Sequence, residues 1–291
     1  MPFLHVNGTD LHCHTMGEGP AVVLVHPPFI GSSVFNYLKH DLARDHQVVQ
    51  FDIRGHGHSP AGDAAVGIPL IAEDIRQLMD RLDIESAYAC GYSCGAMPVF
   101  EALLAAPERF KGAVLLSGMD ELTDRRSRMQ LRAGAMLCGV AREAVIVPVA
   151  LGNADSRTTF GVLHEEGKIG DARRHRDYAE SCLRYSCAGR LNRIDHPVLL
   201  LSGEADEAGC AYARKLQGRL RKAEWQVIAG AGHQLPTKAP DRTCDAIRAW
   251  IAKLEGREAE TAFAAPEVPE GALAAEEAER AVRDAREWER S

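Results

Sequence analysis

The chain has 291 residues, of which 46% are hydrophobic, and this length suits one large domain or one domain with an insertion. The net charge is −7, so we expect no nucleic-acid surface. We also expect no membrane span, because no run of about 18 apolar residues occurs. The N-terminus has no signal-peptide pattern and the eight cysteines include no CxxC pair, so we expect reduced thiols in a cytoplasmic protein.

The first part of the chain alternates short apolar runs with amphipathic stretches. Asn7-Gly8 is a strong turn dipeptide and predicts a hairpin at the start. The apolar runs then predict strands, and the amphipathic stretches predict helices. In chain order we expect a strand at 21–25, a helix at 34–43, a strand at 46–53, a helix at 68–84, a strand at 87–92, a helix at 96–110 and a strand at 112–118.

The same alternation returns near the end, with a strand at 197–203, a helix at 211–220, a strand at 223–230 and a helix at 241–256. Buried strands that alternate with helices predict an α/β fold, with a mostly parallel sheet covered on both faces. We assign residues 1–119 and 191–256 to this core.

A long stretch separates the two halves of the core, and one crossover helix would need far fewer residues. We interpret residues 120–190 as an inserted helical cap with helices within 123–139, 141–151 and 171–189. The alternative is a long, irregular crossover without a role of its own.

The composition changes after Gly256. Residues 257–291 hold ten acidic and five basic residues and are rich in alanine, glutamate and arginine. We interpret this segment as a solvated tail. The alternative is a helix that docks through Trp288 onto its own domain, a second copy or a partner.

The segment GYSCG at 91–95 matches the pattern G-x-S-x-G. An apolar strand precedes it and a helix follows, which is the context of a sharp elbow that exposes a nucleophilic serine. Such a turn needs small residues on both sides, and Gly91 and Gly95 fill these places. We therefore take Ser93 as the candidate nucleophile.

A serine hydroxyl needs a base and an orienting acid to become a good nucleophile. His233 follows the last predicted strand, and Asp206 follows the strand before it. Loops after parallel strands meet at one edge of the sheet, so these side chains can converge on Ser93. Asp120, after the strand at 112–118, is an alternative acid; Glu204 and Glu207 are weaker ones.

Two histidine pairs resemble metal-ligand pairs, namely His12 with His14 and His56 with His58. Zinc sites need three or four ligands, and the sequence offers neither pair a convincing third one. We expect His12 and His14 to share one face of a strand, and we expect no metal.

Four segments together resemble the α/β-hydrolase fold family: HPPF at 26–29, FDIRGHGHS at 51–59, GYSCGAMP at 91–98, and GEAD at 203–206 with GAGH at 230–233. The resemblance covers about residues 3–256. It implies an eight-stranded sheet, a cap between the sixth and seventh strands, and no cofactor. Relatives that hydrolyse epoxides or carbon–halogen bonds have aspartate at the elbow, so serine favours acyl transfer.

The resemblance implies a serine hydrolase that acts on a small-molecule substrate through Ser93, His233 and Asp206. We expect a moderately apolar ester or lactone. Carbon–carbon bond hydrolysis and a signalling receptor with slow or single turnover remain alternatives. The residues expected to line the substrate pocket are Pro28, Tyr92, Met119 and Met136.

The cap sequence bears on the substrate in two ways. Its apolar residues suggest the roof of a pocket: Met129, Met136, Leu137, Val145, Ile146 and Val147. Its arginines either attract a carboxylate-bearing substrate or cover solvated helix faces: Arg125, Arg126, Arg128, Arg132, Arg173, Arg174 and Arg176.

The loop after the first parallel strand carries two consecutive prolines. In the resembling family the loop usually reads His-Gly-X, and the X backbone N–H stabilises the oxyanion together with the residue after the nucleophile, here Cys94. Pro28 occupies X and has no N–H. Either the loop is shifted so that Phe29 donates, or Cys94 acts with a side chain or water.

Overall fold

The computed structural model describes residues 3–257, and its strands form one eight-stranded sheet with the order β1-β2-β4-β3-β5-β6-β7-β8. The two pairs at one edge of the sheet, β1 with β2 and β2 with β4, are antiparallel, and all the other pairs are parallel. The strands are β1 (Phe3–Val6), β2 (Thr9–Met16), β3 (Ala21–Val25), β4 (Gln47–Phe51), β5 (Ala87–Tyr92), β6 (Phe110–Leu116), β7 (Val198–Gly203) and β8 (Ala223–Ile228). The predicted mostly parallel sheet is confirmed.

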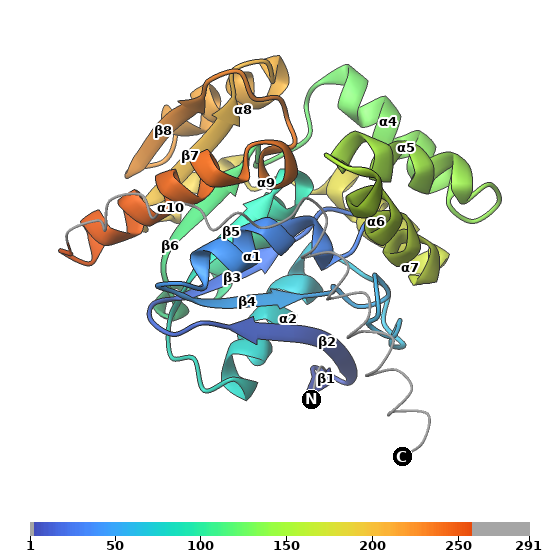
Figure 1. Cartoon of the computed structure of the whole chain (residues 1–291), viewed down its shortest axis with the longest axis horizontal. Helices are drawn as coiled ribbons and strands as arrows, with labels where there is room; N and C mark the ends of the chain where they lie inside the picture. The colour runs from blue at the N-terminus through green and yellow to red at the C-terminus, as the bar shows by residue number, and fades with distance from the viewer. Residues whose placement is uncertain (1–2, 258–291) are drawn as a thin grey trace.

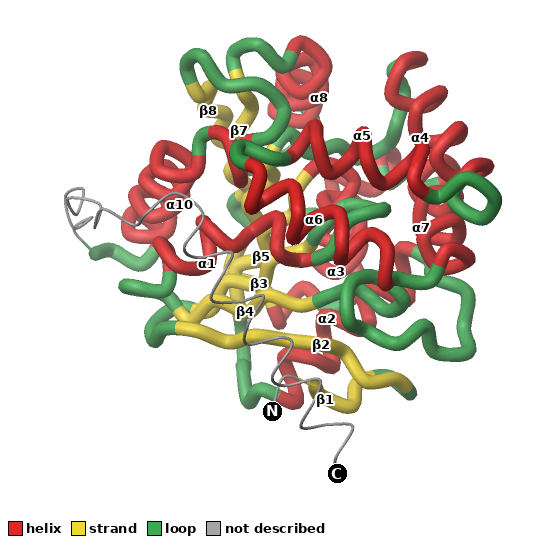
Figure 2. Tube along the Cα trace, turned by 45° about the vertical axis from the view of Figure 1, so that its right-hand side comes forward, coloured by secondary structure: helices red, strands yellow, loops and turns green. Residues whose placement is uncertain are grey.

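The strands are apolar on both faces because helices cover both sides of the sheet (Figures 1 and 2). In β3, Val22 and Leu24 belong to one hydrophobic cluster, and Val23 and Val25 belong to the other. Apolar residues of α2, α3 and α8 complete one cluster, and those of α1, α9 and α10 complete the other. The helices are α1 (Asn36–Leu42), α2 (Ile68–Arg81), α3 (Ala96–Ala105), α8 (Glu207–Gln217), α9 (Leu235–Lys238) and α10 (Pro240–Leu254), with short 3-10 helices at Ser32–Phe35, Ser93–Gly95, Pro107–Arg109 and Ala188–Arg193.

Four helices lie between β6 and β7, and Figure 1 shows them grouped beside the sheet. They are α4 (Arg125–Leu137), α5 (Glu143–Asn153), α6 (Arg157–Ile169) and α7 (Ala172–Arg184). The sequence interpretation missed α6, which begins where the Ser156 side chain accepts a hydrogen bond from the Thr159 backbone N–H. The arrangement supports our proposed division into a core and a cap at 120–190.

Buried polar contacts join this cap to the core. The Ser33 hydroxyl of the core donates a hydrogen bond to Glu166 on α6 at 2.5 Å, and the Tyr178 hydroxyl on α7 donates one to the His26 carbonyl at 3.1 Å. Burial, followed by the charge of Asp52, raises the pKa of Glu166 to about 8. Glu166 is therefore largely neutral at pH 7, which lowers the cost of burying it.

Within residues 3–257, no helix combines the length and the apolarity that a membrane span requires. The predicted tail, including Trp288, lies outside the described residues.

Candidate active site

The nucleophile elbow has the geometry that its glycines predict. Ser93 directly follows β5 and has a φ of 53°, a left-handed conformation that is rare for residues other than glycine. A Cβ on Gly91 would lie 2.6 Å from the Gly95 carbonyl oxygen, and one on Gly95 would overlap the Val25 carbonyl oxygen. Both positions therefore require glycine, and the turn presents the Ser93 side chain at the end of the strand.

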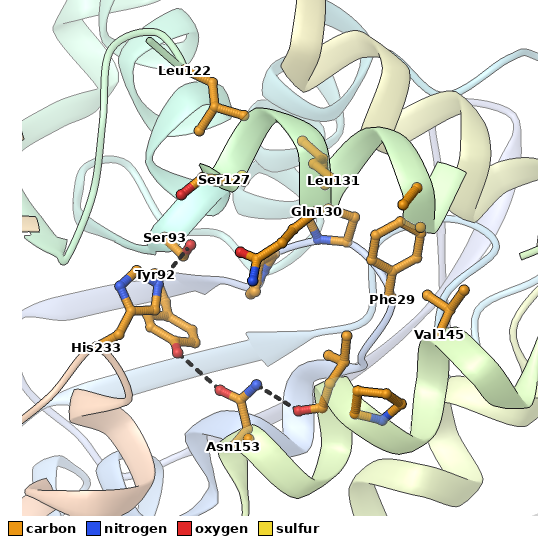
Figure 3. Close-up of a pocket in the computed structure, with 18 of the residues that line it drawn as sticks. Phe29, Tyr92, Ser93, Leu122, Ser127, Gln130, Leu131, Val145, Asn153 and His233 are labelled. Carbon is orange, nitrogen blue, oxygen red and sulfur yellow. Dashed lines mark hydrogen bonds between the residues drawn. The ribbon is translucent and has the colours of Figure 1, made fainter. Parts of the chain in front are cut away.

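His233 connects Ser93 to a carboxylate. Its Nε2 lies 3.0 Å from the Ser93 Oγ, and its Nδ1 lies 2.8 Å from Oδ2 of Asp206. The other carboxylate oxygen of Asp206 accepts a hydrogen bond from the Gly209 N–H at the start of α8. The structure thus brings the three predicted residues into one hydrogen-bonded chain, with the loops after β5, β7 and β8 as its supports (Figure 3 shows Ser93 and His233).

The electrostatics of Asp206 suit the acid in this chain. Its burial acts to raise the pKa of the carboxyl group, while the hydrogen bond and the charge of His233 act to lower it. The net result is a pKa below the ordinary aspartate value, so the group is a carboxylate at neutral pH. A carboxylate can hold the His233 ring in one tautomer and stabilise its cation.

Asp120, the alternative acid, is fully buried and makes no hydrogen bond to His233. Neither of its carboxylate oxygens has a hydrogen-bond partner among residues 3–257, and its nearest cations are Lys215 at 3.8 Å and Arg219 at 3.9 Å. Burial raises its pKa. Glu204 instead accepts a hydrogen bond from the Gly230 N–H. Asp206 is therefore the carboxylate that contacts His233.

The proline-containing loop brings Phe29 to the site in an unusual conformation. Phe29 has a φ of 74°, and it lines the same cavity as Pro27, Pro28 and Cys94. No described residue accepts a hydrogen bond from the backbone N–H of Phe29 or Cys94. Both N–H groups therefore remain available as donors, and their role at an oxyanion stays a prediction.

A cavity of about 510 Å³ adjoins Ser93 and His233, between the core loops and the cap (Figure 3). Figure 3 shows Ser93 and His233 on one side of it, and Phe29 and Val145 on the other. The predicted pocket residues Pro28, Tyr92 and Met119 line this cavity. Its volume lies within the range of ordinary small-molecule pockets.

Met136 was predicted to line the pocket, and this prediction is wrong. Its side chain is 67% exposed, on the outer surface of α4, and that of Met129 is 64% exposed. The wall of the cavity consists of the opposite face of the helix, with residues at the helical spacing of three and four. These are Ser127, Gln130, Leu131, Gly134 and Leu137.

Four polar lining residues were not predicted from the sequence: Ser127, Gln130, Asn153 and Gln234. The Tyr92 hydroxyl donates a hydrogen bond to the Asn153 Oδ1 at 2.9 Å, so Asn153 is held in place. Identifying the three in the cap would have required knowing which faces of α4 and α5 are turned toward the core. None of the seven arginines named above lines the cavity, and among residues 3–257 no carboxylate, ammonium or guanidinium group lines its wall.

The structure also corrects one detail of the histidine analysis. His12 and His14 lie side by side on β2, as predicted, with ring centroids 4.6 Å apart. However, the side chains of Asp52 and His58 lie close to His12, although Asp52 and His58 are distant from it in the sequence. His12 therefore has two neighbours that could also bind a metal ion.

Known proteins with a similar sequence or fold indicate the class of this chain. A family model for the alpha/beta hydrolase fold matches residues 20–134. The family model, the curated relatives and the fold all support the α/β-hydrolase superfamily.

Individual relatives agree with this class. Esterase YbfF of Escherichia coli K12 is 27% identical over 249 residues, which is 79% of this chain and 92% of that protein. The enol-lactonase structure from Burkholderia xenovorans LB400 superposes with a TM-score of 0.77 at 21% identity, covering 86% of this chain and 100% of that one. The esterase EaEST from Exiguobacterium antarcticum has a TM-score of 0.78 at 16% identity, covering 87% and 98%.

Proposed function

We propose that the protein is a serine hydrolase that cleaves a small, uncharged, moderately apolar ester or lactone. The observation that carries the proposal is the hydrogen-bonded chain from Ser93 through His233 to Asp206, at 3.0 and 2.8 Å. This chain opens onto a cavity large enough for a small substrate. Relatives named as an esterase and an enol-lactonase support hydrolysis on this fold.

The first half of the reaction forms an acyl-enzyme. His233 Nε2 accepts the proton of the Ser93 hydroxyl as Oγ attacks the substrate carbonyl carbon. The carbonyl oxygen becomes an oxyanion, and Asp206 stabilises the imidazolium. The tetrahedral intermediate then expels the alkoxide, which takes the proton from His233. A lactone opens at this step, and its alcohol end stays attached to the acyl group.

Two backbone N–H groups serve the oxyanion in this proposal, those of Cys94 and Phe29. The left-handed conformation of Phe29 supports the shifted loop, in which the donor comes one residue after Pro28. Each donor of this kind contributes roughly 3 to 4 kcal/mol to transition-state stabilisation. The prolines would thus remove one donor from the loop and the conformation of Phe29 would supply another.

The second half of the reaction releases the acid. A water molecule gives a proton to His233 and attacks the acyl carbon, and the proton returns to Ser93 as the carbon–oxygen bond breaks. No redox step or cofactor enters this sequence.

The wall of the cavity supports the choice of an uncharged substrate. It is mostly apolar, and its polar side chains apart from Ser93 and His233 are the neutral ones of Tyr92, Ser127, Gln130, Asn153 and Gln234. A substrate carboxylate would lose its hydration there without a cation to replace it, which is costly.

Hydrolysis of p-nitrophenyl esters with acyl chains of increasing length tests the proposal, together with labelling by a fluorophosphonate. We expect multiple turnovers and stoichiometric labelling. Ser93→Ala should abolish labelling and lower kcat by about four to six orders of magnitude. Ser127→Ala is the matched control, because this serine lines the cavity without contacting His233, and it should retain labelling.

The outcome also separates the alternatives. A burst of one product molecule per chain, with no further turnover, would favour a slow signalling receptor over an enzyme. Turnover only of substrates cleaved at a carbon–carbon bond would favour a carbon–carbon bond hydrolase over an ester hydrolase. Full activity of Ser93→Ala would contradict the mechanism itself.

A further inference from the structure

Three side chains with metal-ligating atoms meet away from the serine site. His12 lies on β2, Asp52 directly follows β4, and His58 lies in the loop between β4 and α2. One ligand atom of each residue lies within 4.8 Å of the other two. In the described part of the chain, this is the one group of three or more His, Cys, Asp or Glu residues with such spacing.

The spacing fits one ion. Nδ1 of His12 lies 3.0 Å from Oδ2 of Asp52, and Nδ1 of His58 lies 3.7 Å from the same oxygen. Zinc bonds nitrogen and oxygen ligands at about 2.0–2.2 Å with tetrahedral geometry, which separates the ligand atoms by about 3.4 Å. The two distances lie on either side of this value, and the third separation, between His12 and His58, is at most 4.8 Å, so side-chain movements of about 1 Å would place all three atoms on one ion.

The group contains a buried nitrogen without a hydrogen bond. Nδ1 of His58 is shielded from solvent and has no hydrogen-bond partner among the described residues, and the Asp52 side chain beside it is fully buried. A buried polar atom without a partner costs free energy. A cation between His58 and Asp52 would bind this nitrogen together with Asp52 Oδ2, which already accepts a hydrogen bond from the His58 backbone N–H at 3.0 Å.

The surroundings orient the ligands as second-sphere contacts usually do. Nε2 of His12, the ring nitrogen that does not face Asp52, lies 3.2 Å from Nε2 of His14. The second oxygen of Asp52, Oδ1, accepts a hydrogen bond from the Ser32 N–H at 2.7 Å. A Cβ at position 57 would overlap Asp52 Oδ2, so Gly57 is required for the loop to pass this close to the carboxylate.

An ion could reach the group from solvent. His58 lines a surface cavity of about 580 Å³, together with residues of the cap such as Arg142 and Asp171. The His58 side chain is 32% exposed. The His58 ring thus separates this opening from the buried Nδ1 and Asp52, and a rotation of the ring would admit an ion.

We propose that His12, Asp52 and His58 bind one divalent metal ion of the zinc class. Two imidazoles and a carboxylate suit zinc and its borderline neighbours better than the all-oxygen sites of calcium or magnesium. The ion would replace the proton shared by His12 and Asp52, releasing it to solvent. It would link β2, the end of β4 and the following loop, and it is separate from the proposed chemistry at Ser93.

Zinc binding to the untagged, full-length chain tests the proposal, measured by calorimetry after treatment with EDTA and by Co²⁺ absorption in the visible range. We expect one zinc ion per chain, tetrahedral Co²⁺ bands without a thiolate charge-transfer band, and a melting temperature raised by about 5 °C at roughly 100 times Kd. His58→Ala should weaken binding at least about tenfold, and His14→Ala should weaken it by about tenfold through the ring contact.

His164→Ala is the matched control, because His164 contacts the Glu143 carboxylate at 2.7 Å on the cap and belongs to no such group. It should bind zinc like the wild type. A wild-type chain that binds no zinc, or a folded His58→Ala chain that binds it equally well, would overturn the proposal. If His58→Ala fails to fold, unchanged affinity in His14→Ala together with octahedral Co²⁺ bands would do so.

Discussion

Ser93 shows what the elbow requires of a single residue. Its φ of 53° costs about 1 to 2 kcal/mol relative to an ordinary conformation. Gly91 and Gly95 make the turn possible, because a side chain at either position would overlap the neighbouring backbone. The benefit is that the hydroxyl stands free at the strand end, within 3.0 Å of His233. Local strain and access to the base thus come from the same turn.

The two carboxylates after neighbouring strands give a prediction at this scale. Asp206→Asn should lower kcat by about 10⁴, because an amide in place of the carboxylate no longer stabilises the correct tautomer and cation of His233. Asp120→Asn should leave kcat within about twofold, since Asp120 does not contact His233. Steady-state kinetics on one p-nitrophenyl ester would compare them, and equal losses would reassign the acid.

The residues of the site differ in how far the sequence could identify them. Ser93, His233 and Asp206 follow strands within motifs, so their meeting could be predicted from strand order alone. The face of α4 that lines the cavity could not, because apolar Met129 and Met136 point to solvent while polar Gln130 lines the wall. The phase of a cap helix is set by tertiary packing, which hydrophobicity along one chain does not determine.

Among the elements, α7 carries a buried histidine where the cap meets the core. His175 is fully buried and stacks on His56 with ring centroids 4.2 Å apart, and neither ring nitrogen has a hydrogen-bond partner among residues 3–257. Burial, aided by the charge of Arg142, lowers the pKa of His175 to about 3. The cap–core junction therefore depends on a neutral imidazole.

This junction should weaken in acid. The unfolded chain protonates His175 near pH 6.5 and the folded chain only near pH 3, so the unfolded state binds more protons between these values and stability falls as the pH falls. Between pH 7 and pH 5 this histidine accounts for about 2 kcal/mol of the loss. His175→Leu should therefore lose about 2 kcal/mol less than the wild type over this interval, as measured by urea unfolding.

If His175→Leu instead followed the wild-type pH dependence, the His175 imidazole would not be neutral in the folded protein.

Two glycines on α6 provide a matched pair. An added Cβ on Gly161 meets nothing within 4 Å, whereas one on Gly167 would lie 2.5 Å from the Ile146 Cγ2. Gly161→Ala should stabilise the protein by up to about 1 kcal/mol through helix propensity. Gly167→Ala should destabilise it by about 1 to 3 kcal/mol through overpacking. Chemical denaturation measures both, and a stabilising Gly167→Ala would mean that α5 and α6 pack less closely.

The strands that are buried on both faces of the sheet could be predicted from the sequence, because their burial makes them continuously apolar. The strands at 21–25 and 87–92 were predicted with their observed bounds, since a strand covered on both faces is continuously apolar. By contrast, α6 was missed because Gly161 and a mixed apolar and charged sequence obscure its periodicity. The four-residue α9 is too short to show any periodicity.

At the scale of the whole molecule, the sheet, both core clusters and the candidate site all lie within residues 3–257. A chain ending at Arg257 should therefore keep the proposed hydrolase activity and a melting temperature within about 2 °C of the full chain. Calorimetry and sedimentation of both chains measure this. A lower melting temperature or a changed oligomeric state would support the alternative that the segment around Trp288 docks.

The candidate site is dispersed along the chain, since Ser93 and His233 are 140 residues apart in sequence. The pair can meet only after β5, β6, β7 and β8 have joined in order. A partly synthesised chain, or one whose last strand has detached, therefore cannot hydrolyse anything by this route. The turnover rate of a sample is therefore proportional to the fraction of molecules whose sheet is fully assembled. In a cell, the total activity would depend equally on the amount of the protein and on the fraction of it that has folded.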